Sequence, residues 1–283
     1  MKTEEEVVFR LYKSGDLSEA QIQKIWFPTD ASGALQPTWT IDYGLQEQLL
    51  LEACYRSHTA LIDRLLTPIL LDYCAFDTIE EVLDVAQDLH LLSVLRFYVE
   101  YSICDLNEVL YWACKQPSLD EDAELRAIFN MLMKNDTVNK AFESNLCIGA
   151  AAKYGNLYAV NALLACAEVD PSDYSSYALS MASKYGHLDV VERLLRHSSV
   201  CPSDDDNRAI RLACKYHHTH VVRLLLENRK VDPSCMSNVC MKHAVEFAVD
   251  TGNHDLVIAL LADDRVEMSN SQILSLLERT EIP

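Results

Sequence analysis

The chain of 283 residues carries 43 acidic and 24 basic side chains, giving a net charge of −19, and contains only seven glycines. So acidic a balance argues against nucleic acid or an anionic membrane as partner, since both attract basic faces. No apolar run reaches membrane-spanning length, the acidic N-terminus lacks a signal-peptide core, and no Cys-x-x-Cys pair occurs. We therefore expect a cytoplasmic protein with reduced cysteines.

Residues 1–43 do not share the internal repeat that organises the rest of the chain. Residues 4–12 and 17–27 read as two short helices, the second capped by Asp16 or Ser18, and prolines and glycine in residues 28–37 indicate a loop. A stacked array needs a terminal cap that shields its apolar end. The pattern predicts a helical N-terminal cap over residues 1–43.

Residues 44–135 contain three diverged copies of the repeat, centred on Ala53, Ala86 and Ala113. In each copy, aliphatic pairs follow the small residues at helical spacing and predict a pair of helices. In the third copy a polar insert, residues 116–124, separates the two helices. Its proline and acidic residues predict a loop.

Residues 136–265 contain the clearest copies. Ala-Ala-Lys-Tyr-Gly-Asn, Ala-Ser-Lys-Tyr-Gly-His and Ala-Cys-Lys-Tyr-His-His begin at residues 151, 182 and 213, a constant spacing of 31. Each continues into a leucine pair, preceded by one valine in the first copy and by a valine pair in the other two, and closes on a Pro-Ser turn. A fourth copy, around Ala248, follows after 35 residues because about four residues are added near 235–242. Residues 266–283 are predicted to form a C-terminal capping helix.

These residues resemble the ankyrin repeat, whose core reads small-small-x-x-Gly-His, then two aliphatic residues, a leucine pair and a turn. Gly186-His187 matches this core outright, while Gly155-Asn156 and His217-His218 match it in part. The family's Thr-Pro-Leu-His opening is missing, and a Val-Asp-Pro-Ser turn replaces its Gly-Ala-Asp linker. The resemblance implies an all-α, ankyrin-type helical solenoid of about seven stacked helix pairs behind the N-terminal cap.

The physical pattern supports the same fold. Alanine and cysteine at the paired small positions let neighbouring helices approach closely, and the valine and leucine pairs give each helix one apolar face. A single unit cannot bury that face, so neighbouring units must stack. Leu194 and Leu225 are therefore predicted to lie in the core.

No group of residues indicates an enzyme, a metal or a cofactor. His217, His218 and His220 lie beside Cys214, but a zinc site needs four convergent ligands, and the repeat's own turn explains His218. Ten cysteines and nine histidines make chance pairs expected, and none carries a local catalytic signature. We predict no catalytic residue, metal ligand or cofactor.

The functional signal lies in exposed positions that repeat although packing does not require it. In the ankyrin family the two positions after the small pair face the concave groove and vary with the partner; here they are lysine and tyrosine. Tyrosine is enriched at interface hot spots. The plainer interpretation is duplication of one founding repeat. The candidate partner-binding residues are Lys153, Tyr154, Lys184, Tyr185, Lys215 and Tyr216 on the inner helices, and Asp173, Tyr174, Asp204, Asp205 and Arg208 at the hairpin tips.

The resemblance implies a monomeric, non-catalytic recognition module that binds another protein through the concave face of residues 145–265. The diverged repeat sequence is similar to repeats from amoebae, giant viruses and intracellular bacteria such as Legionella. This resemblance implies an effector that acts on a host protein in the host cytosol. One alternative is an enzyme with its site in residues 1–135 and the clear repeats as a substrate-docking arm. A ubiquitin-ligase adaptor ranks lower, because residues 1–43 show no F-box-like pattern.

Overall fold

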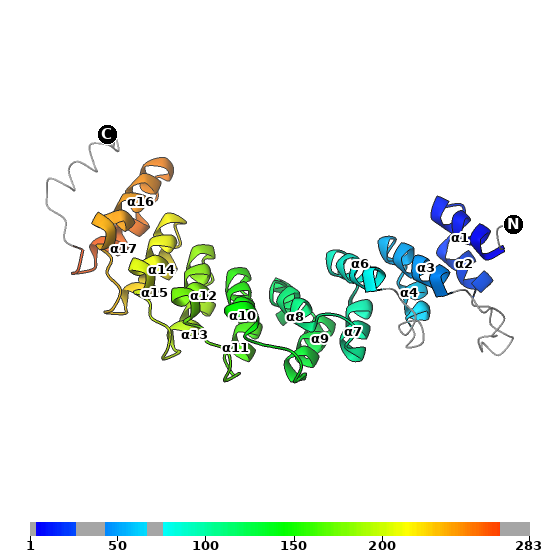
Figure 1. Cartoon of the computed structure of the whole chain (residues 1–283). Coiled ribbons are helices and arrows are strands. Elements are labelled where there is room, and N and C mark those ends of the chain that lie inside the picture. Colours follow the sequence, from blue (N-terminus) through cyan, green and yellow to red (C-terminus); the bar gives the residue numbers. More distant parts are fainter. Residues whose placement is uncertain (1–3, 27–42, 67–75, 267–283) are drawn as a thin grey trace. The chain divides into compact units, whose positions relative to one another are not determined.

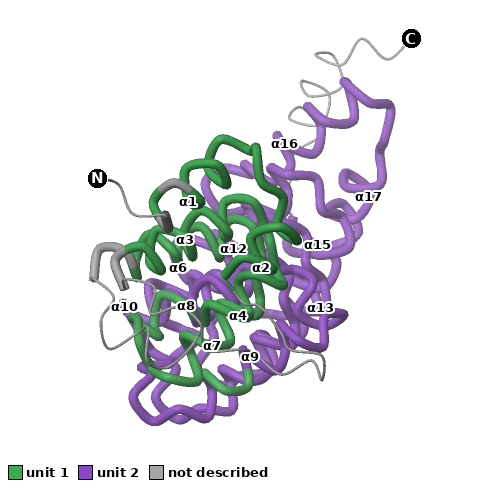
Figure 2. Tube along the Cα trace, turned by 90° about the vertical axis from the view of Figure 1, so that its right-hand side faces the viewer, with its two compact units in different colours: residues 1–109, 130–132 green, residues 110–129, 133–283 purple. Residues whose placement is uncertain are grey.

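The computed structural model describes residues 4–26, 43–66 and 76–266 (Figure 1). These ranges contain sixteen α-helices, one 3-10 helix and no strand, which confirms the all-α prediction. The chain divides into two compact units (Figure 2): unit 1 comprises residues 1–109 with 130–132, and unit 2 comprises residues 110–129 with 133–283. The loop predicted for residues 28–37 and the capping helix predicted for residues 266–283 lie outside the described residues, apart from Val266.

The described helices of unit 1 pair along the chain. The pairs are α1 (Glu4–Ser14) with α2 (Glu19–Trp26), α3 (Tyr43–Tyr55) with α4 (Thr59–Leu65), and α6 (Phe76–Asp88) with α7 (Leu92–Tyr101). Helix α1 also packs on α3, α3 on α6, and α4 on α7, so successive pairs stack against one another. The diverged copies centred on Ala53 and Ala86 therefore form stacked helix pairs in unit 1.

The first two helices pack on the first repeat as a terminal cap does. Ser18 caps α2 with a capping box: its backbone N–H donates to Gln21 Oε1 at 2.9 Å, and the Gln21 N–H donates back to Ser18 Oγ at 3.4 Å. Tyr12 is buried, and its hydroxyl hydrogen-bonds His58 Nδ1 at 2.6 Å, which ties α1 to the turn after α3. Helix α1 is thus bonded to the histidine that follows the first small pair, and a capping role for the first two helices stays a prediction.

Unit 2 is built from two rows of helices, joined in pairs (Figure 1). Helix α8 (Leu106–Cys114) spans the division between the units and precedes η1 (Pro117–Asp120) and α9 (Ala123–Lys134). One row, which we call the inner helices, is α10 (Phe142–Tyr154), α12 (Asp173–Tyr185), α14 (Asp204–Lys215) and α16 (Cys235–Thr251). The other is α11 (Leu157–Leu163), α13 (Leu188–Leu195), α15 (Thr219–Leu226) and α17 (Asp255–Leu261).

The core of unit 2 repeats with the sequence. Ala151, Ala182 and Ala213 have no exposed surface, and neither have the leucines Leu194 and Leu225. Small side chains on adjacent inner helices let these helices approach, while the leucines of the second row fill the space between helix pairs. The predicted core positions are confirmed.

Part of the polar insert, residues 116–124, is helical although the sequence predicted a loop. Residues 117–120 form the 3-10 helix η1, and Leu119 within it is fully buried. The insert is also hydrogen-bonded to the next repeat, because Asn156 Nδ2 donates to the Gln116 carbonyl at 3.1 Å. A loop was therefore the wrong prediction for residues 117–120. One apolar side chain and one long-range hydrogen bond were enough to order a locally polar segment.

The displaced fourth copy is accommodated inside a helix. Helix α16 has 17 residues, whereas α12 has 13 and α14 has 12. About four extra residues amount to roughly one helical turn, so the apolar face of the helix is kept. The change of spacing from 31 to 35 residues consequently leaves the packing of α16 on α14 intact.

Candidate functional site

The ends of the inner helices are set by contacts between neighbouring repeats. Gly155 ends α10 and Gly186 ends α12, both with positive φ (+73° and +79°), the left-handed conformation that glycine adopts most easily. The histidine of the following repeat packs on each glycine: a β-carbon on Gly155 would lie 2.5 Å from His187 Nδ1, and His218 lies equally tightly against Gly186. No side chain would fit between these repeats.

The same histidines hydrogen-bond the preceding repeat. His187 Nε2–H donates to the Lys153 carbonyl, and His218 Nε2–H donates to the Lys184 carbonyl, both at 2.9 Å. Each repeat is therefore fixed to the backbone of the residue that carries the candidate lysine. This histidine–glycine contact sets the register between successive lysine and tyrosine positions.

Lysines and tyrosines interleave across the repeats. Lys153 Nζ lies 5.1 Å from the ring centroid of Tyr154, in its own repeat, and 5.9 Å from that of Tyr185, in the next. Lys184 Nζ likewise lies 5.1 Å from the Tyr185 centroid and 5.2 Å from the Tyr216 centroid. Lys215 Nζ completes the set at 6.0 Å from the Tyr216 centroid. We call these six residues the Lys–Tyr ladder.

The tyrosines of the Lys–Tyr ladder are accessible. Tyr154, Tyr185 and Tyr216 are 38%, 42% and 42% exposed, so each presents part of its side chain to solvent. The nearby hydroxyls of Tyr154 and then Tyr185 raise the pKa of Lys153, so the ammonium stays charged at neutral pH. Among the described residues, none forms an ion pair with a lysine of the Lys–Tyr ladder.

The structure adds Tyr111 of α8 and Lys115, which follows this helix; sequence reasoning missed both. Lys115 occupies the lysine position of its repeat, but Gln116 stands where the three clearest repeats have tyrosine. Tyr111, one helical turn earlier, supplies the ring, with Lys115 Nζ 4.7 Å from its centroid. Burial and then the nearby Tyr154 raise the pKa of Tyr111, which places its hydroxyl close to the Lys–Tyr ladder. The Ala-Cys-Lys sequence at residues 113–115, which recurs at residues 213–215, was the signal available in the sequence.

The Lys–Tyr ladder stops at α14. In the fourth copy Asp250 and Thr251 take the lysine and tyrosine positions. His217 stands where the other repeats have glycine, and its ring stacks on Phe247 with centroids 3.9 Å apart, at an interplanar angle of 9°. Asn253, which takes the position of the bonded histidines, is exposed. A different ring contact therefore replaces the histidine–glycine contact at this junction.

The hairpin tips have an unusual backbone. Three successive residues take left-handed φ values at each tip: residues 143–145, 174–176, 205–207 and 236–238. This conformation is costly for residues with a side chain, and contacts from the next repeat hold it. Asn145 Oδ1 accepts the Asp170 N–H at 2.8 Å, and Asn207 Oδ1 accepts the Asp232 N–H at 2.7 Å.

Two of the predicted tip residues take part in this tip structure. Asp173 Oδ2 accepts a hydrogen bond from Asn145 Nδ2 at 3.0 Å, and Asp204 Oδ2 accepts one from Ser176 Oγ at 2.7 Å. Both carboxylates are only partly exposed. The two carboxylates therefore have a structural role, because each joins adjacent repeats.

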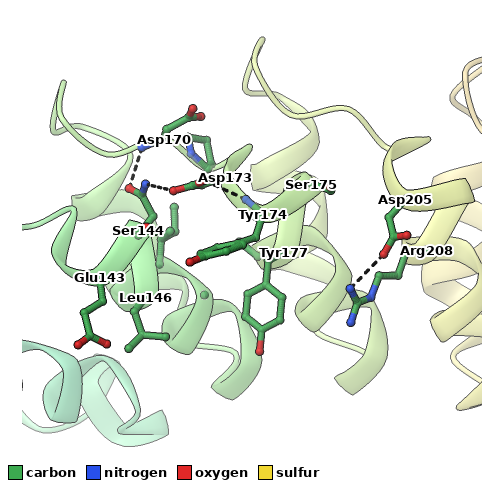
Figure 3. Close-up of a pocket in the computed structure, with 15 residues that line it drawn as sticks. Glu143, Ser144, Leu146, Asp170, Asp173, Tyr174, Ser175, Tyr177, Asp205 and Arg208 are labelled. Carbon is green, nitrogen blue, oxygen red and sulfur yellow. Dashed lines mark hydrogen bonds and ion pairs between the residues drawn. The ribbon is translucent and has the colours of Figure 1, made fainter.

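The remaining predicted tip residues line an open groove of about 860 Å³ (Figure 3). Tyr174 is 67% exposed, and Arg208 pairs with Asp205 at 3.1 Å on the far rim. Tyr177 also lines the groove, packed over Gly149, where an added β-carbon would lie 3.0 Å from the ring. The hydroxyl of Tyr177 helps to raise the pKa of Lys153, so the groove adjoins the Lys–Tyr ladder.

The histidine cluster is explained by structure. His218 and His220 bond backbone carbonyls of the preceding repeat, and His217 stacks on Phe247. Within the residues that the structure describes, no three histidine, cysteine or carboxylate side chains converge as metal ligands. Burial raises the pKa of the Cys54 thiol to about 12 and that of Cys104 to about 11, which disfavours the thiolate form that a nucleophile needs.

Comparison with known families agrees with the repeat pattern. Residues 146–237 and 179–272 match the family model for ankyrin repeats (three copies), a segment a little under half of the chain. This segment, which contains most of α10 and all of α11 to α17, therefore carries ankyrin repeats; the total of seven units stays a prediction. No curated protein matches the chain significantly. None of the described helices is both long and apolar enough to cross a membrane.

Proposed function

We propose that the chain is a non-catalytic recognition module that binds another protein through the Lys–Tyr ladder. Ankyrin repeats imply protein–protein interaction, and the ladder lies within the segment that matches their family model. The observation that carries the proposal is the interleaving of lysines with tyrosines of neighbouring repeats on an exposed surface. Tyrosines held in place by packed neighbours lose little conformational entropy on binding.

The groove at the hairpin tips extends the proposed surface. Tyr177 lines the groove and lies near Lys153, so one partner could contact both regions. Tyr174, Asp205 and Arg208 would then lie at the edge of the interface, where charges mainly affect association rate and the choice of partner. We expect substitutions in the Lys–Tyr ladder to reduce affinity more than substitutions at the tips.

The enzyme alternative would place a site in residues 1–135. The raised pKa values of the Cys54 and Cys104 thiols argue against either of these two cysteines as the nucleophile of such a site. The adaptor alternative needs a free apolar face on the first two helices, yet Ile22 and Trp26 of α2 are buried. Recognition through unit 2 is the simpler account.

Affinity capture with paired variants tests the proposal. The ladder variant is Tyr154→Ala/Tyr185→Ala/Tyr216→Ala, and the matched control is Tyr55→Ala/Tyr101→Ala, whose tyrosines are similarly exposed but lie in unit 1. Circular dichroism first establishes that both are folded. We expect a partner that is retained by the parent chain and the control and lost by the ladder variant. Equal retention by both variants would reject the Lys–Tyr ladder as the interface.

A finer hypothesis is that the partner is a host protein and the chain an exported effector acting as a monomer in the host cytosol. This hypothesis rests on the sequence of the repeats, which have the Val-Asp-Pro-Ser turn and lack the Thr-Pro-Leu-His opening. Capture from a eukaryotic lysate beside a bacterial lysate tests it. A ladder-dependent partner found only in the bacterial lysate would count against the host assignment.

A further inference from the structure

The Lys–Tyr ladder gathers lysines of successive repeats into one row on an acidic chain. Its three lysines, with Lys115 beside them, form no ion pair with any described residue, although the chain carries a net charge of −19. Their ammonium groups lie instead over tyrosine rings, whose faces attract cations while leaving the positive charge in place. The result is a row of uncompensated positive charge on an acidic protein.

We infer that the partner presents an extended acidic segment to this row, with side-chain carboxylates bound by successive lysines and tyrosine hydroxyls. The inference rests on the proposed function and specifies the chemistry of its partner. The net charge of −19 by itself would favour a basic partner. At physiological salt, however, charges beyond about 8 Å are largely screened, so the nearest groups decide what binds.

The spacing of the lysines suits an extended chain. Lys153 Nζ and Lys184 Nζ lie 5.9 Å and 5.1 Å from the same ring centroid, that of Tyr185, so the two ammonium groups are at most about 11 Å apart. An extended chain advances about 3.1–3.4 Å per residue. Carboxylates two or three residues apart in an extended chain would therefore reach consecutive lysines.

Tyrosine favours a carboxylate ligand in two ways. Its hydroxyl donates a hydrogen bond, and bonds to charged acceptors are stronger than neutral ones. Its ring faces are already in contact with lysine ammonium groups, from two lysines in the cases of Tyr185 and Tyr216. Nucleic-acid bases bind aromatic side chains by stacking on open ring faces, so the arrangement favours an acidic peptide over a single-stranded nucleic acid.

The test uses fluorescein-labelled decaglutamate as the probe, with decaglutamine as the uncharged control peptide. Binding to the full chain is followed by fluorescence anisotropy at about 0.15 M salt. In this binding assay the ladder variant carries lysine substitutions, Lys153→Gln/Lys184→Gln/Lys215→Gln, in place of the tyrosine substitutions used for capture. The matched control is Lys134→Gln/Lys230→Gln/Lys242→Gln, which removes the same charge from exposed lysines elsewhere in unit 2.

We expect decaglutamate to bind the parent chain and the control variant, and the ladder variant to bind about tenfold more weakly. A Lys153→Arg/Lys184→Arg/Lys215→Arg variant should keep most of the affinity, and all variants should unfold at the parent's temperature. Equal weakening in the ladder and control variants, or no binding by the parent chain, would overturn the inference. Tighter, ladder-dependent binding of an oligothymidylate would overturn it in favour of a nucleic acid.

The experiment separates this inference from the proposed function. If decaglutamate fails while protein capture still depends on Tyr154, Tyr185 and Tyr216, the recognition surface stands and only the acidic partner is wrong. If capture is insensitive to these tyrosines and decaglutamate also fails, both proposals fall.

Discussion

Substituting alanine for Gly155 tests the contact that holds the repeats in register. Gly155 has φ of +73°, and an added β-carbon would lie 2.5 Å from His187 Nδ1. Gly252 has nearly the same φ, +74°, but has nothing within 4 Å of an added β-carbon. Both substitutions introduce the same left-handed alanine, so their difference isolates the contact with the histidine ring.

The expected magnitudes follow from these geometries. A left-handed alanine costs about 1–2 kcal/mol at either position. At Gly155 the ring of His187 must also move, which costs about 1–3 kcal/mol of packing and about 0.5–1.5 kcal/mol for the hydrogen bond to the Lys153 carbonyl. We expect Gly155→Ala to lower the free energy of unfolding by about 2–4 kcal/mol more than Gly252→Ala.

Urea unfolding of the full chain, followed by far-ultraviolet circular dichroism, measures both values. Gly15→Ala, at φ +86° with nothing within 4 Å, serves as a second control in unit 1. In a His187→Ala background the extra cost of Gly155→Ala should largely disappear, since the ring is gone. Equal destabilisation by Gly155→Ala and Gly252→Ala, to within about 0.5 kcal/mol, would refute this account of the register.

Four further predictions test other parts of the structure. Leu194→Ala should cost about 2–5 kcal/mol in the same urea assay, because the side chain is fully buried; a cost below about 1 kcal/mol would contradict its place in the core. Arg265→Ala should lower the free energy of unfolding by about 2 kcal/mol, because the guanidinium donates to Asp263 and to three backbone carbonyls that follow α15, those of Leu226, Asn228 and Val231. An unchanged urea midpoint would contradict this prediction. Burial lowers the pKa of His217 below 6.5, so the contribution of this histidine to stability is present above pH 6.5 and is lost as the pH falls through the lowered value. The urea midpoint of the parent chain should therefore decline between about pH 8 and about pH 5, and His217→Asn should make this decline shallower. An unchanged slope in the variant would contradict the role given to His217. Because their pKa values are raised, Cys54 and Cys104 should react with iodoacetamide far more slowly in the folded chain than in urea, whereas a faster reaction when folded would support the enzyme alternative.

The sequence predicted the elements that depend on local periodicity. The repeated small residues and aliphatic pairs located the helices and the buried leucines, because each helix must bury one apolar face against its neighbours. It also predicted that the repeated histidines are structural. The contact of His187 with Gly155 supplies the reason.

Features that depend on the distance between repeats could not be predicted in this way. The lysine of one repeat meets the tyrosine of the next because the histidine–glycine contact fixes the register, and no local pattern encodes that register. Tyr111 joins the surface from a different position of its own repeat, which a repeat alignment cannot show. Leu119 is buried within a stretch whose composition is polar.

Photo-crosslinking from the Lys–Tyr ladder would test the central claim most directly. Benzoylphenylalanine replaces Tyr185 in one version of the full chain and Tyr101, which is similarly exposed, in another. Irradiation in the lysate that contains the captured partner should give a covalent adduct from position 185 and none from position 101. An adduct from position 101 with none from position 185 would contradict binding through the ladder.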